Sequence, residues 1–160
     1  MEVQEVQIEW HGFLDAVLKP VNRRTELAGF LFSSGPYQER EVWHVLQVKN
    51  IGLKGDTFGG WAPDKADMAR VKRDAKERSW VKLGNVHTHP LSKEHASAGY
   101  ANDVETAKHP SGTDLKFAAR FNDIVRGIVV VDYDSKPPTI PMIRFHDKRD
   151  RTIREIVEAV

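Results

Sequence analysis

The sequence contains no cysteine among its 160 residues. This excludes disulfides, thiol nucleophiles and zinc sites built from thiolates. Basic and acidic residues nearly balance, with 24 Lys and Arg against 23 Asp and Glu, so the charge typical of proteins that bind nucleic acids or membrane surfaces is missing. No segment approaches the roughly 20 apolar residues of a membrane span. Residues 1–5 do not resemble a secretory signal.

These absences predict a protein of a reducing compartment, with the cytoplasm as its expected location and no nucleic-acid or membrane partner. The length is that of one ordinary domain, and 40% hydrophobic residues are enough for a buried core. No internal repeat or linker divides the chain, so residues 1–160 are expected to form a single domain. The sequence indicates no oligomeric state.

Apolar residues recur with two periods, which predicts a mixed α/β chain, of the α+β kind, with a sheet flanked by helices. Short apolar and β-branched runs predict strands at 3–10, 25–33, 41–51, 81–87, 124–131 and 139–145. Helical spacing predicts helices at 11–19, 64–79, 111–121 and 150–160. Gly and Pro predict a turn at 34–36 and a loop at 52–61.

Two histidines, His87 and His89, stand one residue apart at the end of a predicted strand. Residues i and i+2 of a strand point to the same face, so both imidazoles can approach one metal ion. Pro90 is expected to end this strand and place the pair at the rim of the sheet. Two exposed histidines at a strand end are the simpler interpretation of the same pattern.

A second motif, Pro110-Ser111-Gly112-Thr113-Asp114, opens a predicted helix. Ser111 and Asp114 have the spacing of a capping box, in which each side chain binds the other residue's backbone. Asp114 could also supply a carboxylate oxygen to a metal, and the two interpretations are compatible. Two histidines and one carboxylate would leave a fourth tetrahedral position for water, as in catalytic zinc sites.

Glu26 precedes an apolar strand that runs from Leu27 to Phe32. It could be the last exposed residue before the strand enters the core. It could also be the base that metal-assisted hydrolysis needs to take a proton from water and pass it to the leaving amine.

Together these motifs resemble the signature of the JAMM (MPN+) zinc metalloprotease family. In this sequence, E-x-x-G-x-L begins at Glu26, H-x-H-P at His87 and P-S-x-x-D at Pro110, in the family's order. The resemblance implies the MPN fold, a curved, mixed and mainly antiparallel sheet with helices on either side, similar to cytidine deaminases. A single domain without adaptor segments is most similar to the prokaryotic members.

The resemblance also implies the chemistry. His87, His89 and Asp114 would bind one Zn²⁺, Glu26 would be the general acid/base, and Ser111 would stabilise the oxyanion. The family implies an isopeptidase or peptidase that acts after the C-terminus of ubiquitin or a ubiquitin-like protein. The alternative is a catalytically inactive MPN-type scaffold that binds partners. The sequence has no Cys-x-x-Cys of nucleobase deaminases and no His-Glu-x-x-His of zincins.

The sequence departs from the family in one place. A much longer segment than usual separates His89 from Asp114, so residues 91–109 are interpreted as an insertion that forms a lid or contacts substrate. Asp103 lies nearer the usual distance and is a rival ligand, but it lacks the preceding Pro-Ser, so Asp114 is favoured. His95 and His109 are expected to be surface histidines.

Overall fold

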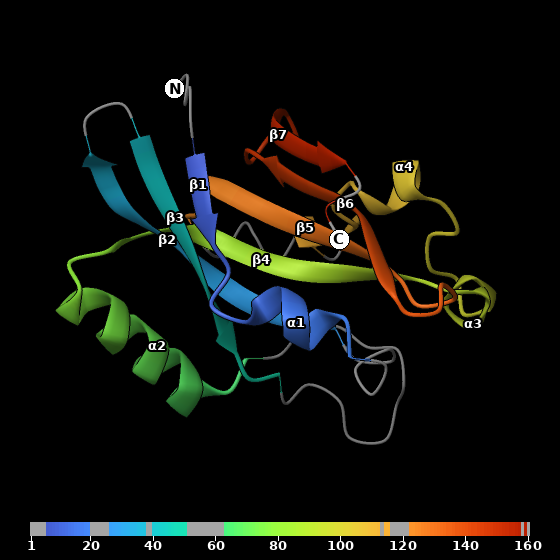
Figure 1. Cartoon of the computed structure of the whole chain (residues 1–160), viewed down its shortest axis with the longest axis horizontal. Helices are drawn as coiled ribbons and strands as arrows, with labels where there is room; N and C mark the ends of the chain where they lie inside the picture. The colour runs from blue at the N-terminus through green and yellow to red at the C-terminus, as the bar shows by residue number, and fades with distance from the viewer. Residues whose placement is uncertain are drawn as a thin grey trace.

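The computed structural model describes residues 6–19, 26–37, 40–50, 63–112, 114–115, 122–157 and 159. These residues form a mixed sheet that curls into a half-barrel and is flanked by a few short helices (Figure 1). Within these ranges, no helix is long and apolar enough to cross a membrane.

The sheet has seven strands in the order β1-β3-β2-β4-β5-β6-β7. The pairs β1–β3 and β4–β5 are parallel and the other pairs are antiparallel, which confirms the predicted mixed, mainly antiparallel sheet. The strands are β1 Val6–Glu9, β2 Ala28–Tyr37, β3 Arg40–Val48, β4 Val81–Leu91, β5 Val125–Asp132, β6 Thr139–His146 and β7 Thr152–Val157. The helices are α1 Phe13–Val17, α2 Lys65–Glu77, α3 Lys93–Ser97 and α4 Val104–Ala107.

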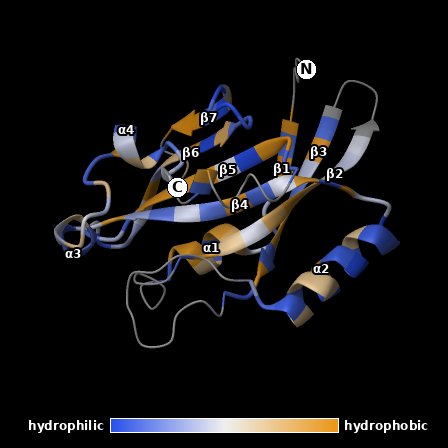
Figure 2. Cartoon of the chain, turned by 180° about the vertical axis from the view of Figure 1, so that it is seen from behind, coloured by the Kyte–Doolittle hydropathy of each residue, from blue (hydrophilic) through white to orange (hydrophobic). Residues whose placement is uncertain are grey.

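The two faces of the sheet are packed differently. One face carries the largest core cluster, which includes Phe13 and Val17 of α1 together with central strand residues such as Val129. The other face carries two smaller clusters, one over β2 and β3 beneath α2 and one over β5 and β6 beneath α4. Most of α2 is hydrophilic, with Val71 and Ala75 buried against the sheet (Figure 2). The middle of this second face, over β4, lies between the two small clusters.

The predicted C-terminal helix at 150–160 is wrong, because residues Thr152–Val157 form strand β7. Ile153, Ile156 and Val157 have a spacing that a helix and a strand both permit, and β-branched residues favour the strand. The turn before it is fixed by the carboxylate of Asp147, which accepts hydrogen bonds from the backbone N–H groups of Arg149 and Arg151. This turn brings β7 antiparallel to β6, a partner that local sequence does not reveal.

Two strands are longer than predicted. Strand β2 continues through the expected turn at 34–36, and β4 continues past Pro90 to Leu91. The backbone N–H of Thr88 points toward β2 and donates to the carbonyl of Leu27, which is the last backbone hydrogen bond between these two strands. The backbone nitrogen of Pro90 points to the same side, beyond the end of β2, so proline is tolerated there. A missing N–H there removes no bond between strands.

The structure also tests some of the helices predicted between the strands. Helix α2 confirms the predicted helix at 64–79, while α3 was not predicted. Residues 112, 114 and 115 are helical, as predicted for 111–121, but 116–121 lie outside the described residues. The predicted loop at 52–61 also lies outside them.

We predict that Gly84→Ala destabilises the fold by at least about 2 kcal/mol, because overpacking a tight core site costs about 1–3 kcal/mol or more. A Cβ at Gly84 would overlap the carbonyl oxygen of Val125, the backbone contact that joins β4 to β5. Gly112→Ala is the matched control, since nothing lies within 4 Å of its added Cβ. Denaturant unfolding measures both, and equal stabilities would contradict the predicted clash.

Candidate metal centre

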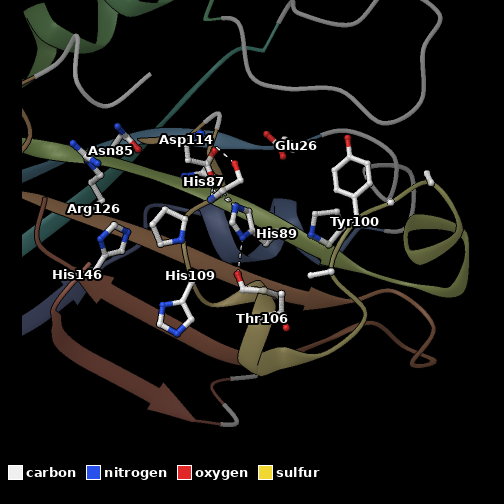
Figure 3. A pocket seen from close by; sticks show the side chains of 17 residues that line it. Glu26, Asn85, His87, His89, Tyr100, Thr106, His109, Asp114, Arg126 and His146 are labelled. Carbon is white, nitrogen blue, oxygen red and sulfur yellow. Dashed lines mark hydrogen bonds and ion pairs between the residues drawn. The ribbon is translucent and has the colours of Figure 1, made fainter. Parts of the chain in front are cut away.

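Three side chains converge at the middle of the second face of the sheet. His87 Nε2 lies 2.9 Å from His89 Nε2, and Asp114 Oδ2 lies 3.3 Å from the first and 3.0 Å from the second. Zinc bonds of about 2.0–2.2 Å in tetrahedral geometry place ligand atoms about 3.3 Å apart. The residues present therefore fit a metal ion, and the three donor atoms point toward one another in Figure 3.

Strand β4 supplies both histidines from the same side of its backbone. His87 is buried and His89 is half-buried. His89 donates through its Nδ1–H to the carbonyl of Ala107, at 2.6 Å, which leaves Nε2 as the nitrogen that faces Asp114. Metal-binding histidines are commonly oriented by such a second hydrogen bond. Helix α4, which ends at Ala107, therefore orients the imidazole.

Asp114 takes part in the predicted capping box, which the structure confirms. Its backbone N–H donates to Ser111 Oγ at 3.1 Å, and its Oδ2 accepts from the backbone N–H of Ser111 at 2.8 Å. The same Oδ2 contacts both imidazoles. Asp114 can therefore fix the start of its helix and serve the metal group at once.

Electrostatics couples these residues. Burial favours a raised pKa for Asp114, but hydrogen bonds and positive charge from His87 and His89 hold that pKa well below its usual range. Burial likewise favours a lowered pKa for His87, yet its hydrogen bond to Asp114 and that carboxylate's charge raise it above its usual value. Without a metal, the carboxylate of Asp114 therefore favours the protonated form of His87.

Asp103, the rival ligand, does not belong to this group of described residues. Its carboxylate caps α4 by accepting the backbone N–H of Thr106 at 2.7 Å. Asp103 is exposed, and the hydrogen bonds from Thr106 lower its pKa.

The segment 91–109 contains two short helices, α3 and α4. The prediction that His95 is a surface residue is wrong. It is 1% exposed, lies within hydrogen-bond distance of Ser92 Oγ, and packs edge-on against Tyr100. Such aromatic packing within a loop segment has no local sequence signal. His109 is exposed, as predicted.

Glu26 lies beside the metal group, as Figure 3 shows. Ala28 is in register with His87, and the backbone N–H of Thr88 donates to the carbonyl of Leu27. Continued by one more residue, this antiparallel register places Glu26 opposite His89. Burial raises the pKa of Glu26, while the nearby histidines oppose the shift. A carboxyl with a raised pKa next to a metal group is suited to carry a proton.

A cavity of about 550 Å³ opens in front of the metal group, and Glu26 and Ser111 also line it. One wall comes from the segment 91–109, through Tyr100 and small residues such as Ala101. Sequence reasoning missed the opposite end, where Asn85, Arg126 and His146 lie. A charged Arg126 inside an apolar strand was the signal available, and Asn85 shares a face with His87.

Comparisons with known proteins give a likeness of fold. The solution structure of protein DSY2949 from Desulfitobacterium hafniense matches with a TM-score of 0.50 and 15% identity, over 92% of this chain and 88% of that chain. The crystal structure of AF2198, a JAB1/MPN domain protein from Archaeoglobus fulgidus, matches with a TM-score of 0.42 and 16% identity, over 94% of each chain. No protein-family model and no curated protein matches the sequence.

Purified protein reconstituted with zinc should lose its metal on Asp114→Ala and retain it on Asp103→Ala. The second substitution removes only the cap of α4 and should lower the stability slightly. Elemental analysis of the washed proteins measures their zinc content, and thermal unfolding measures the stability lost with the cap. Loss of zinc with Asp103→Ala alone would show that the third ligand has been misassigned.

Metal affinity should fall as the pH falls. His87 must be neutral to bind a metal, and in the metal-free protein its pKa is raised, chiefly by Asp114 acting against burial. Below that raised pKa a proton must leave before the metal binds, so affinity declines up to about tenfold per pH unit. Competition with a chelator between pH 8 and pH 5.5 measures this, and a flat profile would exclude His87 as a ligand.

Proposed function

We propose that this protein is a zinc-dependent peptidase or isopeptidase, which hydrolyses the bond after the C-terminus of ubiquitin or a ubiquitin-like protein. One observation carries the proposal: two imidazoles and one carboxylate converge at the floor of a cavity, with Glu26 beside them. The resemblance of the three motifs to the JAMM signature supports the reaction and the substrate class.

Zinc fits the donor set, because it prefers nitrogen and oxygen ligands in a tetrahedral arrangement and catalytic sites supply three of them. His87, His89 and Asp114 would hold the ion. When bound, zinc supplies a Lewis acid that polarises the scissile carbonyl and favours deprotonation of water. The donor set opens onto a cavity, which supports a catalytic rather than a closed structural site.

Glu26 is proposed to move the proton. Its raised pKa, caused by burial, allows the carboxylate to take a proton from the attacking water and the acid to return it to the leaving amine. Asn50 donates a side-chain hydrogen bond to the carbonyl of Glu26 at 2.9 Å, which fixes the backbone from which this carboxylate projects.

Ser111 is proposed to contact the oxyanion that forms at the scissile carbonyl. Its Oγ accepts the backbone N–H of Asp114, so the hydroxyl hydrogen can be donated into the cavity. A donor that points to developing negative charge stabilises the transition state.

The segment 91–109 is proposed to contact substrate. Ala98, Gly99 and Ala101 are small residues at the cavity wall, which suits an extended tail of low bulk. Lys93 N–H donates to the carboxylate of Asp134, and Ser92 caps α3, so the wall is attached to the body of the domain.

Glu26→Gln should lower the turnover of a ubiquitin-like fusion at least 100-fold, the usual contribution of a general acid/base, without loss of zinc. Glu77→Gln, at the exposed end of α2, is the matched control and should keep full turnover. A panel of ubiquitin and ubiquitin-like fusions, followed by gel and mass spectrometry, measures this. Zinc-loaded wild type that cleaves none of them would favour the scaffold alternative, and an active Glu26→Gln would exclude the assigned base.

A further inference from the structure

Three polar residues form a row across three neighbouring strands, and on β4 this row lies two residues before His87. Asn85 of β4 is in register with Arg126 of β5, and Arg126 is in register with His146 of β6. All three line the cavity. In Figure 3 they lie on one side of His87, and Tyr100 lies on the other. The cavity therefore has a polar, cationic end next to the metal group.

Arg126 is a charged residue in β5, a strand that is otherwise apolar until Asp132 at its end, and it is only 6% exposed. Its Nε lies 3.6 Å from Asp123 Oδ2, and Asn85 donates to that same oxygen at 2.6 Å. A guanidinium has five N–H donors, more than one carboxylate can accept. A buried arginine at a cavity wall can therefore serve Asp123 and a ligand together.

His146 adds an incomplete polar group to this end of the cavity. It is 1% exposed, and its Nδ1–H donates to the carbonyl of Asp147 at 2.7 Å. Among the described residues, its buried Nε2 has no hydrogen-bond partner. Buried polar atoms are normally satisfied, so a group that enters the cavity would complete this one.

We propose that Asn85, Arg126 and His146 form a subsite for a carboxylate on the leaving group of the substrate. This inference rests on the proposed function and narrows it. The bond hydrolysed would be the peptide bond before a C-terminal residue whose α-carboxylate is free, rather than an isopeptide bond to a lysine side chain. Arginine suits this role because its planar guanidinium can bind a carboxylate with two hydrogen bonds.

The spacing along the strands agrees with this substrate. Asn85 and His87 are two residues apart on β4, which corresponds to about 7 Å. A single residue spans about 3.5 Å, and a hydrogen bond of about 2.8 Å to arginine extends the reach to about 6 Å. A scissile carbonyl at the metal group would therefore place the carboxylate of the next residue near Arg126.

The reaction is an ordinary hydrolysis. Water adds its oxygen to the carbonyl carbon, the C–N bond breaks, and the amine leaves with the proton that Glu26 took from the water. The released amino acid carries its carboxylate unchanged from the subsite. No oxidant or further reactant is required.

Binding of the carboxylate is coupled to a proton on His146. Burial lowers the pKa of His146, and Arg144 and Arg126 lower it further against the hydrogen bond to Asp147 and the charge of Asp150. A bound carboxylate offsets the positive charge of both arginines, which favours a protonated His146 ring that donates from Nε2. Calorimetry in two buffers of different ionisation enthalpy would then detect proton uptake near neutral pH.

The test uses two tail peptides that end in alanine, one with a free carboxylate and one with a C-terminal amide. Zinc-loaded Glu26→Gln protein binds without turnover, so calorimetry reports affinity alone. The free acid should bind at least tenfold more tightly, as expected for a charge-assisted hydrogen bond. In wild type, the acid should have a kcat/KM at least tenfold above that of the amide.

Arg126→Gln in the same Glu26→Gln background should reduce this preference to within twofold. Lys82→Gln is the matched control, because Lys82 is a cation near Asp123 that does not line the cavity, and it should keep the preference. His146→Phe should abolish proton uptake and weaken the preference. Equal affinity for the two peptides, or a preference that survives Arg126→Gln, would overturn the subsite.

The design separates this inference from the proposed function. If no peptide or fusion is hydrolysed but Arg126 still discriminates acid from amide, the peptidase proposal fails and the carboxylate site stands. If fusions are hydrolysed and the two peptides are treated alike, the peptidase stands and the carboxylate site fails. The comparison of two ligands in one protein does not depend on how well any variant folds.

Discussion

The pairing of the start of β2 with the middle of β4 is the constraint on which the site depends. Ala28 is in register with His87, and the backbone and hydroxyl of Thr88 close the last contact with Leu27. Because strand residues alternate between faces, a slip of one residue would turn both histidines to the opposite face. The same register brings Glu26 level with the metal group. One strand pair therefore fixes three of the positions that the proposed chemistry requires, those of His87, His89 and Glu26.

Asp114, the proposed third ligand, reaches the site by a different route, through a helix start instead of a strand. The capping box between Ser111 and Asp114 holds the carboxylate where both imidazoles can contact it. The segment 91–109 contributes as well, since the carbonyl of Ala107 orients His89. Residues 91–109 are therefore part of how the centre is built, in addition to forming a wall of its cavity.

Much of the fold and of the candidate site could be predicted from local sequence, and the predictions that were wrong have physical reasons. The i, i+2 spacing of His87 and His89 and the Ser-x-x-Asp spacing are local patterns, and the structure brings those residues together. The C-terminal segment was misassigned because Ile153, Ile156 and Val157 suit both periods, and only pairing with β6 decides between them. His95 was misjudged because its burial depends on packing against Tyr100. The row from Asn85 to His146 depends on register across three strands, which no local pattern contains.

The surroundings of two carboxyl groups at the centre shift their pKa values in opposite directions. Asp114 is held ionised by His87 and His89 despite burial, while burial raises the pKa of Glu26 despite the same histidines. The difference lies in direct hydrogen bonds, which Asp114 makes with both imidazoles. A group held ionised is suited to bind a cation, and a group with a raised pKa is suited to exchange protons during the reaction. The surroundings thus separate a ligand from an acid/base, which supports the roles proposed for these two residues.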